Sequence, residues 1–361
     1  MEQLSKIAAQ FLLQGHIRQI TPLGNGLIND TYLIQTQEDT PDYVLQRINN
    51  AIFRDVDLLQ HNIEVVTTHI RRKLEAAGEK DLERKVLTFI STLQGKTYYQ
   101  DTDGSYWRVS IFIPRNKTLD VVTPASSYDA GKAFGRFEAM LTDLHEPLGE
   151  TIPDFHNMEL RIRQLREAIA ADSLGRVSEV KDELAFIALY ADEMCQAERL
   201  YREGKLPKRI CHCDTKVNNM LFDEQGQVLC VIDLDTVMPS FVFSDFGDFL
   251  RTAANTVAED CPDLDCVQFR EDVFEAFSHG YLESARTFLT PLELQLLPFA
   301  VGLFPMMQAV RFLTDYLNGD TYYKTAYPLH NLVRTRNQLQ LFRCIKEKEE
   351  RIRSVLNLSV K

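Results

Sequence analysis

Apolar and polar residues in the first third of the chain alternate in a way that is typical of β-strands. We expect a small sheet between residues 17 and 113, interrupted by one helix. The helix is expected over 56–74, where apolar residues recur at intervals of three and four. The expected strands are 20–34 (two strands around a glycine-containing turn), 43–48, 86–93 and a hairpin over 96–113.

The pattern changes to a helical period from residue 126 onward. A further short amphipathic helix is expected at the N-terminus. The sequence therefore indicates an α+β fold of two lobes, a β-rich lobe over 1–113 and a helical lobe over 114–361, with a hinge at 114–117. The expected helices are 129–145, 160–171, 181–203, 245–256, 271–284, 291–317 and 329–356.

Composition limits the class of protein. Apolar residues make up 45% of the chain and charged residues 25%, as in ordinary soluble proteins. A net charge of −12 without a basic run argues against nucleic acid as a partner, and no stretch of about 20 apolar residues is evident. Seven cysteines, an odd number without repeated spacing, favour a reducing cytoplasm. Nothing in the sequence indicates an obligatory protein partner.

The segment from Ile210 to Phe222 contains the strongest chemical signal. His212, Asp214 and Asn219 have the order and spacing H-x-D-x-x-x-x-N, in which the aspartate takes the proton of a substrate hydroxyl and the asparagine holds Mg²⁺. Lys216 could place a positive charge near the transferred phosphoryl group. We expect His212 to have a structural role.

A second acid, Asp233, follows two apolar runs separated by Asp-Glu-Gln-Gly, which predict a hairpin over 220–232. The hairpin would return Asp233 to the loop that carries Asp214. The alternative is a chance match among polar loop residues, but the motif and its expected context agree, so we interpret the pattern as a phosphotransferase site.

Several segments together resemble the aminoglycoside phosphotransferase family, the small-molecule branch of the protein-kinase-like fold. Within that family the chain is most similar to N-acetylhexosamine 1-kinases. The resemblance implies a two-lobe kinase fold, ATP and Mg²⁺ as cofactors, and transfer of phosphate to the anomeric hydroxyl of GlcNAc or GalNAc. The segments that carry it are 43–49, 212–219, 231–239, 245–248 and 311–320.

The resemblance also implies residue roles. Asp214 would be the base, Asn219 and Asp233 would hold Mg²⁺, and Asp235 would assist the metal or the phosphates. Asp245 would cap a helix and Asp248 would lie in its first turn, and in the family such acids also brace the catalytic loop, so both roles are expected together. The turn Gly24-Asn25-Gly26 would cover the triphosphate, although a plain hairpin turn gives the same pattern.

The third strand departs from the usual kinase pattern. Val44-Leu-Gln-Arg47 has no lysine, so either Gln46 or Arg47 would contact the phosphates, and only one can, because neighbouring strand residues face opposite sides. Glu64 on the following helix is either an ion-pair partner of this strand or a solvent-facing charge.

For the acceptor, the candidate residues are polar groups near the end of an apolar helix. Arg311 would bind the sugar, or else pair with Asp315 as a helical salt bridge. The other candidate ligands are Asp315, Asp320 and Tyr322. The alternatives to an N-acetylhexosamine are an aminoglycoside, choline, homoserine or another sugar, or a nucleotide-binding protein without catalysis.

Overall fold

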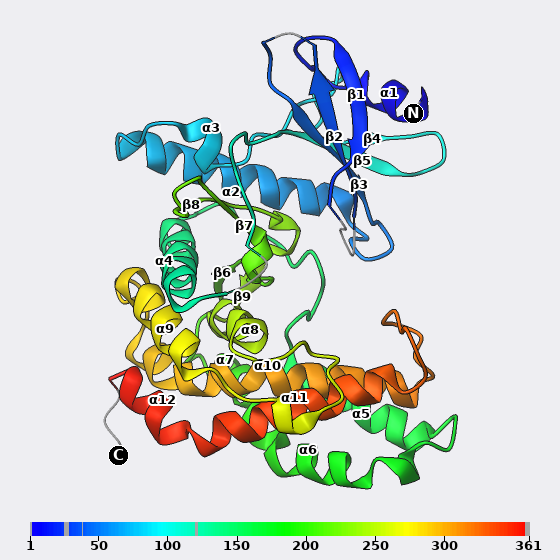
Figure 1. Cartoon of the computed structure of the whole chain (residues 1–361), viewed down its shortest axis with the longest axis vertical. Helices are drawn as coiled ribbons and strands as arrows, with labels where there is room; N and C mark the ends of the chain where they lie inside the picture. Colours follow the sequence, from blue (N-terminus) through cyan, green and yellow to red (C-terminus); the bar gives the residue numbers. More distant parts are fainter. Residues whose placement is uncertain (1, 25–28, 38, 120–121, 358–361) are drawn as a thin grey trace. The chain divides into compact units, whose positions relative to one another are not determined.

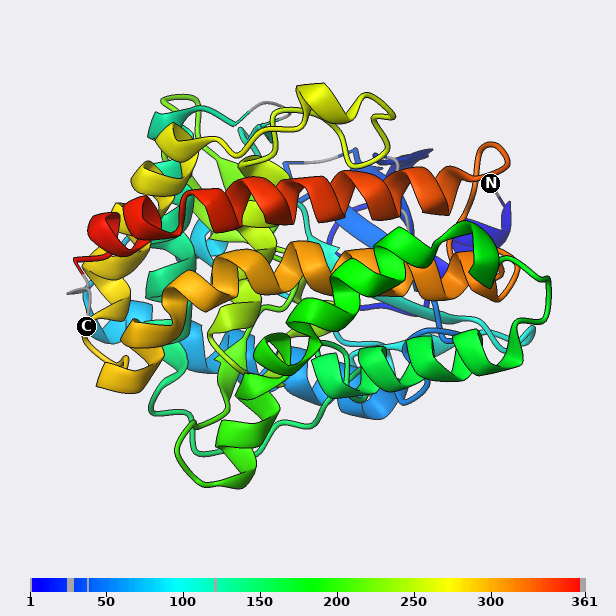
Figure 2. The ribbon, with the colours of Figure 1, turned by 90° about the horizontal axis from the view of Figure 1, so that it is seen from below.

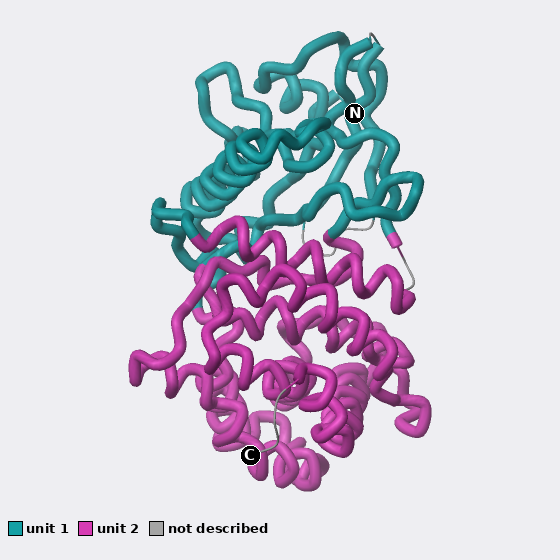
Figure 3. Tube along the Cα trace, turned by 90° about the vertical axis from the view of Figure 1, so that its left-hand side faces the viewer, with its two compact units in different colours: residues 1–118, 143–153, 220–238 teal, residues 119–142, 154–219, 239–361 magenta. Residues whose placement is uncertain are grey.

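The computed structural model describes residues 2–24, 29–37, 39–119 and 122–357, and its elements are labelled in Figure 1. The chain divides into two compact units, which Figure 3 shows in different colours. Unit 1 comprises residues 1–118, 143–153 and 220–238, and unit 2 comprises 119–142, 154–219 and 239–361. An antiparallel sheet in one unit and a largely helical second unit confirm the expected α+β class.

Unit 1 is built on a five-stranded antiparallel sheet with the order β1-β2-β3-β5-β4. The central pair aligns Gln46 of β3 with Arg108 of β5, and Leu45 with Val109. Leu45 and Val109 face a buried apolar cluster that includes residues of α1, so Gln46 and Arg108 lie on the opposite face. The strands are β1 (Ile17–Pro22), β2 (Asp30–Thr36), β3 (Tyr43–Ile48), β4 (Tyr99–Gln100) and β5 (Tyr106–Ile111), and the helix is α1 (Glu2–Ala8).

The prediction of a strand over 86–93 is wrong. A short helix, α3 (Leu82–Lys85), precedes this segment, which makes only isolated bridges. Its backbone hydrogen bonds are divided: Ile90 N–H bonds to Val109 of β5, whereas Leu93 N–H bonds to Gln10, next to α1. The segment therefore never aligns with one neighbour over several residues, and no ladder forms.

Helix α2 (Val56–Ala76) confirms the helix expected inside this lobe, and Asp55 caps it by accepting a hydrogen bond from Leu58 N–H. The hairpin expected over 220–232 is also confirmed, as β7 (Met220–Phe222) and β8 (Val228–Val231). Asn62 of α2 joins these parts of unit 1, because its amide donates to the carbonyl oxygens of Gly149 (2.8 Å) and Val237 (3.0 Å).

Unit 2 is mainly helical, and Figure 2 shows the long helices α10 and α11 side by side. The helix expected over 181–203 is two helices that meet at Cys195, and the one expected over 329–356 is two helices that meet at Lys348. The elements of unit 2 are α4 (Pro124–Leu141), α5 (Met158–Ala171), α6 (Lys181–Met194), α7 (Gln196–Arg202), β6 (Arg209–Cys211), α8 (Phe243–Ala253), α9 (Glu271–Ala285), α10 (Pro291–Leu317), α11 (His330–Glu347) and α12 (Glu349–Val355). The chain passes from unit 1 to unit 2 within the strand β9 (Met238–Ser240).

Helix α10 matches its expected bounds. Among the described helices, α10 alone is long and apolar enough to cross a membrane. The expectation that no stretch of the chain has the length and composition of a membrane span is therefore wrong. However, 83% of its most apolar window is buried inside the structure. Helix α10 is therefore the central core helix of unit 2, and its apolar character serves packing.

Helices α4 and α9 pack closely because glycines line their contact. A Cβ atom added at Gly280 would lie 2.0 Å from the carbonyl oxygen of Tyr128, and one added at Gly131 would lie 2.2 Å from that of Phe277. Both distances are shorter than any real contact, so only glycine permits this approach. The close packing brings Tyr281 of α9 against Glu138 of α4.

Candidate active site

The predicted catalytic loop follows β6 in unit 2 and gathers three of the candidate residues. The Oδ2 atom of Asp214 accepts hydrogen bonds from Lys216 Nζ (2.9 Å) and Asn219 Nδ2 (3.0 Å). Asn219 also donates to the backbone oxygen of Asp214 (2.8 Å). These bonds use neither Oδ1 of Asp214 nor Oδ1 of Asn219. These hydrogen bonds thus fix the orientation of the Asp214 carboxylate within the loop.

A buried acid supports the backbone of this loop. The carboxylate of Asp245 accepts hydrogen bonds from the N–H groups of His212 and Cys213, both at 2.7 Å. Thr215 donates its hydroxyl proton to the backbone oxygen of Asp245 (2.8 Å). Cys213 has φ +62°, a left-handed conformation that costs free energy in a residue other than glycine. The hydrogen bonds to Asp245 hold this conformation.

The two views of Asp245 and Asp248 can now be separated. Helix α8 begins at Phe243 without a side-chain cap, so a capping role for Asp245 is wrong. Asp245 instead braces the loop, and Asp248 accepts a hydrogen bond from Thr215 N–H (3.2 Å). Burial raises the pKa of both carboxyl groups above the ordinary value, and backbone N–H groups act against this rise.

His212 is a packing residue. Its ring is fully buried and meets the edges or faces of Phe134 and Phe137 at centroid distances of 5.7 and 5.8 Å. Its Nδ1 accepts a hydrogen bond from Asp214 N–H (3.3 Å). The ring therefore supports the loop from inside unit 2, in agreement with the structural role expected for it.

In unit 1, the hairpin β7–β8 leads directly to Asp233. This residue has φ +59°, which makes it the second left-handed residue beside the predicted chemistry. Strained backbone in residues other than glycine concentrates at functional sites, where the surrounding structure holds it. Asp233 offers carboxylate oxygens, the ligand type that Mg²⁺ prefers.

Asp235 belongs to a buried polar network of unit 1. Its Oδ2 accepts a hydrogen bond from Asn29 Nδ2 (2.7 Å), and its Oδ1 lies 2.6 Å from Nη1 of Arg108. The second pair is not aligned as a hydrogen bond, so it acts through charge. Arg108 in turn donates from Nε to Gln46 Oε1 (3.0 Å). Both carboxylate oxygens of Asp235 are thus in contact with protein side chains, Oδ2 with Asn29 and Oδ1 with Arg108.

The remaining nucleotide candidates are spread over unit 1. Gln46 shares a face with Arg108, whereas Arg47 lies on the other face, half-exposed and 3.4 Å from Asp30. Glu64 is exposed on α2, and among the described residues no ion pair joins it to Arg47. Gly24 has φ +70°, as a tight turn requires, and Asn25 and Gly26 lie outside the described residues.

Three of the four acceptor candidates, Arg311, Asp315 and Tyr322, line a cavity of about 530 Å³ in unit 2, which is formed by α5, α10 and the segment that follows α10. Asp320 is not among its lining residues. The guanidinium of Arg311 lies 5.6–5.9 Å from the ring centres of Phe155, Tyr322 and Tyr323 and donates to Gln308 Oε1 (3.0 Å). Cation–π contacts of this kind fix an arginine without neutralising it.

Asp315 does not pair with Arg311, so the alternative prediction of a helical salt bridge between them is wrong. Its carboxylate instead accepts hydrogen bonds from the backbone N–H groups of residues 321–323 (2.8–3.0 Å), which shapes the segment that carries Tyr322. Asp320 forms an ion pair with Arg176 (2.8 Å) and accepts a hydrogen bond from Asn331 (2.8 Å). Both acids therefore support the wall of the cavity.

Three buried polar residues near these sites were not anticipated: Asn29, Arg108 and Glu138. Arg108 is the most recognisable in retrospect, because it is the one charged residue in the strand Tyr-Trp-Arg-Val-Ser-Ile. A lone charge in such a strand requires a buried partner. The sequence gives no sign of which residue supplies it.

The α+β fold and the oriented aspartate of an H-x-D-x-x-x-x-N loop are features of kinase-like phosphotransferases. Residues 19–291 match the model of the phosphotransferase enzyme family. The chain belongs to this family.

Solved structures agree on the fold. A microcompartment-associated aminopropanol kinase is 17% identical (TM-score 0.59; 100% of this chain and 99% of that chain covered). An aminoglycoside phosphotransferase from Alicyclobacillus acidocaldarius is 14% identical (0.58; 96% of each). A spectinomycin phosphotransferase solved with ADP and spectinomycin is 13% identical (0.57; 96% and 98%). These similarities confirm the kinase-like fold, which is also that of a choline kinase from Streptococcus pneumoniae.

Proposed function

We propose that this phosphotransferase is an ATP- and Mg²⁺-dependent kinase that phosphorylates the anomeric hydroxyl of an N-acetylhexosamine. The observation that carries the proposal is the fixed carboxylate of Asp214, whose Oδ2 is held by Lys216 and Asn219 while Oδ1 takes no part in those bonds. A positioned base of this kind contributes about 10²–10⁴-fold to a reaction rate.

In the proposed reaction, Oδ1 of Asp214 takes the proton of the anomeric hydroxyl as that oxygen bonds to the γ-phosphorus. The bond between the γ-phosphorus and the bridging oxygen of ATP breaks, which leaves ADP and the sugar 1-phosphate. Lys216 holds the Asp214 side chain in place through its hydrogen bond and would add positive charge beside the transferred group. The chain's part is to orient the hydroxyl and to accept its proton.

The oxygen donors for Mg²⁺ would be Oδ1 of Asn219 and the carboxylate of Asp233. Asp235, whose oxygens face Asn29 and Arg108, would assist only through its charge. Hydrogen bonds from Nδ2 of Asn219 to Asp214 fix the amide so that its carbonyl oxygen remains for a metal. Two protein oxygens suit Mg²⁺, which takes its other ligands from phosphates and water and, when bound, neutralises the triphosphate charge.

The cavity at Arg311 supports a neutral, hydroxyl-rich acceptor. The cavity lining combines Arg161 and Arg311, which form no ion pair among the residues that the structure describes, with the acids Glu167 and Asp315. Donors and acceptors of this kind suit the hydroxyl groups of a neutral acceptor. Tyr322 adds an exposed aromatic ring. The seven cysteines are all free, which supports a reducing cytoplasm as the location.

The test measures ADP formation with GlcNAc, GalNAc, other sugars, choline, homoserine and an aminoglycoside. Asp214→Asn should lower kcat by about 10²–10⁴-fold without unfolding, because its amide oxygen can still accept from Lys216 and Asn219. Asp192→Asn, an exposed acid on α6, is the matched control and should have no effect. Full activity of Asp214→Asn would refute the role of the base, whereas turnover with another acceptor would correct only the substrate.

A further inference from the structure

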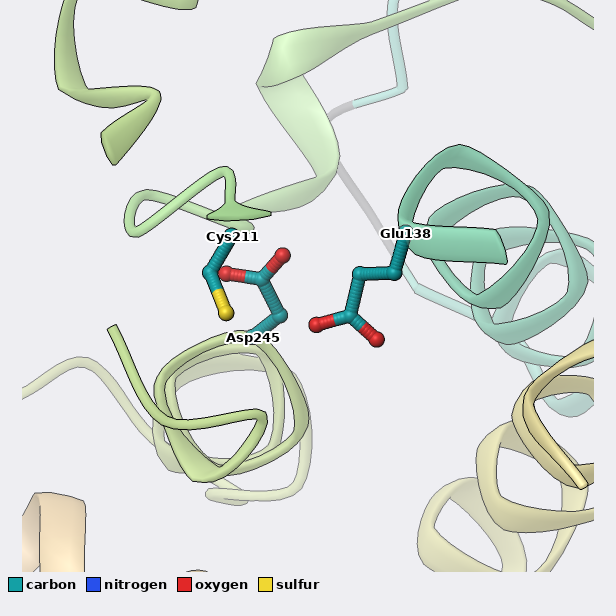
Figure 4. Close-up of side chains that lie close together, drawn as sticks. All are labelled: Glu138, Cys211 and Asp245. Carbon is teal, nitrogen blue, oxygen red and sulfur yellow. The ribbon is translucent and has the colours of Figure 1, made fainter. Parts of the chain in front are cut away.

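A cluster of three buried side chains lies directly behind the catalytic loop. Glu138 of α4, Cys211 of β6 and Asp245 of α8 turn their ends toward one another (Figure 4). One carboxyl oxygen of each acid and the sulfur of Cys211 lie within 4.8 Å of one another. Each side chain is at most 2% exposed. All three belong to unit 2, as does the loop.

Two carboxylates so close together cannot both be ionised away from water. Asp245 is the group that the structure favours in its ionised form, because each of its oxygens accepts a backbone N–H hydrogen bond of 2.7 Å. Glu138 accepts one hydrogen bond, from Tyr281 Oη to Oε2, while its Oε1 is buried without an aligned partner among the described residues. If Oε1 carried a proton, it could act as a hydrogen-bond donor to a neighbouring acceptor.

We propose that Glu138 is a positioning residue, held as a neutral carboxylic acid whose proton points to Asp245 and keeps that carboxylate in place under the catalytic loop. The chain of contacts runs from Tyr281 through Glu138 to Asp245, and from Asp245 to the N–H groups of His212 and Cys213, beside Asp214. Glu138 touches no reacting group and acts through Asp245.

The charged surroundings agree with this assignment. Arg209 of β6 is committed to Glu293 by two hydrogen bonds (2.7 and 2.8 Å), so it does not neutralise Glu138. Burial, followed by the negative charge of Asp245, raises the pKa of Glu138 well above its ordinary value. The titratable groups that face Glu138 are Tyr281 of α9, Cys211 of β6, Asp245 of α8 and His212 of the loop, whose ring contacts Phe134 and Phe137 of α4.

A metal ion is the competing explanation for such a cluster. Metals require a thiolate and available carboxylate oxygens. Burial raises the pKa of the Cys211 thiol well above its usual value, and both oxygens of Asp245 already accept hydrogen bonds. The cluster therefore fits a shared proton better than a cation.

The test compares Glu138→Gln with Glu138→Leu in the full chain. Glutamine can donate to Asp245 and accept from Tyr281, so kcat should stay within about threefold of the parent protein. Leucine removes both bonds, so kcat should fall about tenfold or more while KM for ATP changes less than about twofold. Equal losses in both variants would overturn the proposal.

Stability gives a second readout that needs no substrate. Above about pH 4.3 an unfolded glutamate releases its proton, whereas the folded protein keeps it on Glu138, so the parent protein loses stability as pH rises toward the folded pKa. Glu138→Gln has no such loss, and its Tm should exceed that of the parent by a margin that widens between about pH 5 and about pH 8. A constant or reversed margin would contradict a neutral Glu138.

Two measurements on the parent protein complete the test if Glu138→Leu does not fold. Infrared spectra at about pH 8 should show a protonated carboxyl band that is absent from Glu138→Gln. Elemental analysis should find no stoichiometric zinc, and a bound zinc ion whose removal lowers Tm would overturn the proposal. The kinetic arm rests on the proposed kinase function and uses any acceptor that consumes ATP, while the Tm and infrared arms are independent of it.

Discussion

Replacing Arg108 by methionine should destabilise unit 1 strongly, because it leaves Asp235 as a buried carboxylate without its cation. The two side chains are 3% and 4% exposed, and the closest charged atoms are 2.6 Å apart. At an effective dielectric constant of about 20, their attraction is about 6 kcal/mol. The cost of desolvation offsets part of this attraction, and breaking one side of a buried pair typically costs about 3–5 kcal/mol.

The pair also predicts that the effect of Asp235→Asn on the free energy of unfolding changes sign when Arg108 is absent. Asp235→Asn should destabilise the parent protein, since Arg108 then loses its counterion. In the Arg108→Met background the same substitution should raise stability, because it removes the unpaired charge while its amide oxygen can still accept the hydrogen bond from Asn29. The double variant should therefore be more stable than Arg108→Met alone.

The assay is urea unfolding followed by tryptophan fluorescence. Trp107 is the one tryptophan of the chain, is 5% exposed and precedes Arg108 in β5, so its signal reports on unit 1. Arg47→Met is the matched control: Arg47 pairs with Asp30 across side chains that are 50% and 60% exposed, and should contribute less than about 1 kcal/mol. If Asp235→Asn lowers stability equally in both backgrounds, the charge coupling is refuted.

Two further predictions concern unit 2. Arg311→Met should raise KM for the acceptor about tenfold or more, since a hydrogen bond to a charged group contributes about 1.5–3 kcal/mol, with KM for ATP as the internal control; an unchanged acceptor KM would remove Arg311 from the site. Burial, with Arg311 and Arg161 adding to it, lowers the pKa of His156 well below the usual value, so this histidine remains neutral in the folded protein. Below about pH 6.5 the unfolded chain takes up a proton that the folded protein does not, and stability should fall by up to about 1.4 kcal/mol per pH unit. His156→Gln should flatten this part of the urea midpoint-versus-pH curve, and equal slopes in the two proteins would contradict the assignment.

Elements with a strong local period were predictable from the sequence. The strand Tyr43–Ile48 and the helix Pro291–Leu317 have the expected bounds, because alternation in the first and capping by Thr290 before Pro291 in the second are local signals. The segment 86–93 was not predictable. Its apolar residues satisfy a strand pattern, but their backbone hydrogen bonds go to two different neighbours, a fact of tertiary structure.

The candidate site shows the same division. Asp214, Lys216 and Asn219 were recognisable because the motif places all three within six residues, and they do meet in the structure. The buried partners were not recognisable, since Asn29 lies 206 residues from Asp235 and Glu138 lies 143 residues from Tyr281. A periodic helix pattern treats Glu138 as one polar position among others, and only the close packing of α4 and α9 gives it a buried environment.

The strained backbone links the loop to its buried acids. Cys213, which precedes Asp214, and Asp233, which is itself assigned to metal binding, have left-handed conformations. Each such conformation costs about 1–3 kcal/mol in a residue other than glycine. At Cys213, the hydrogen bonds from two successive N–H groups to Asp245 offset that cost, but only an ionised Asp245 accepts both strongly. A second buried negative charge beside it would work against that ionisation. A neutral Glu138 therefore lets one carboxylate carry the charge that the loop geometry requires.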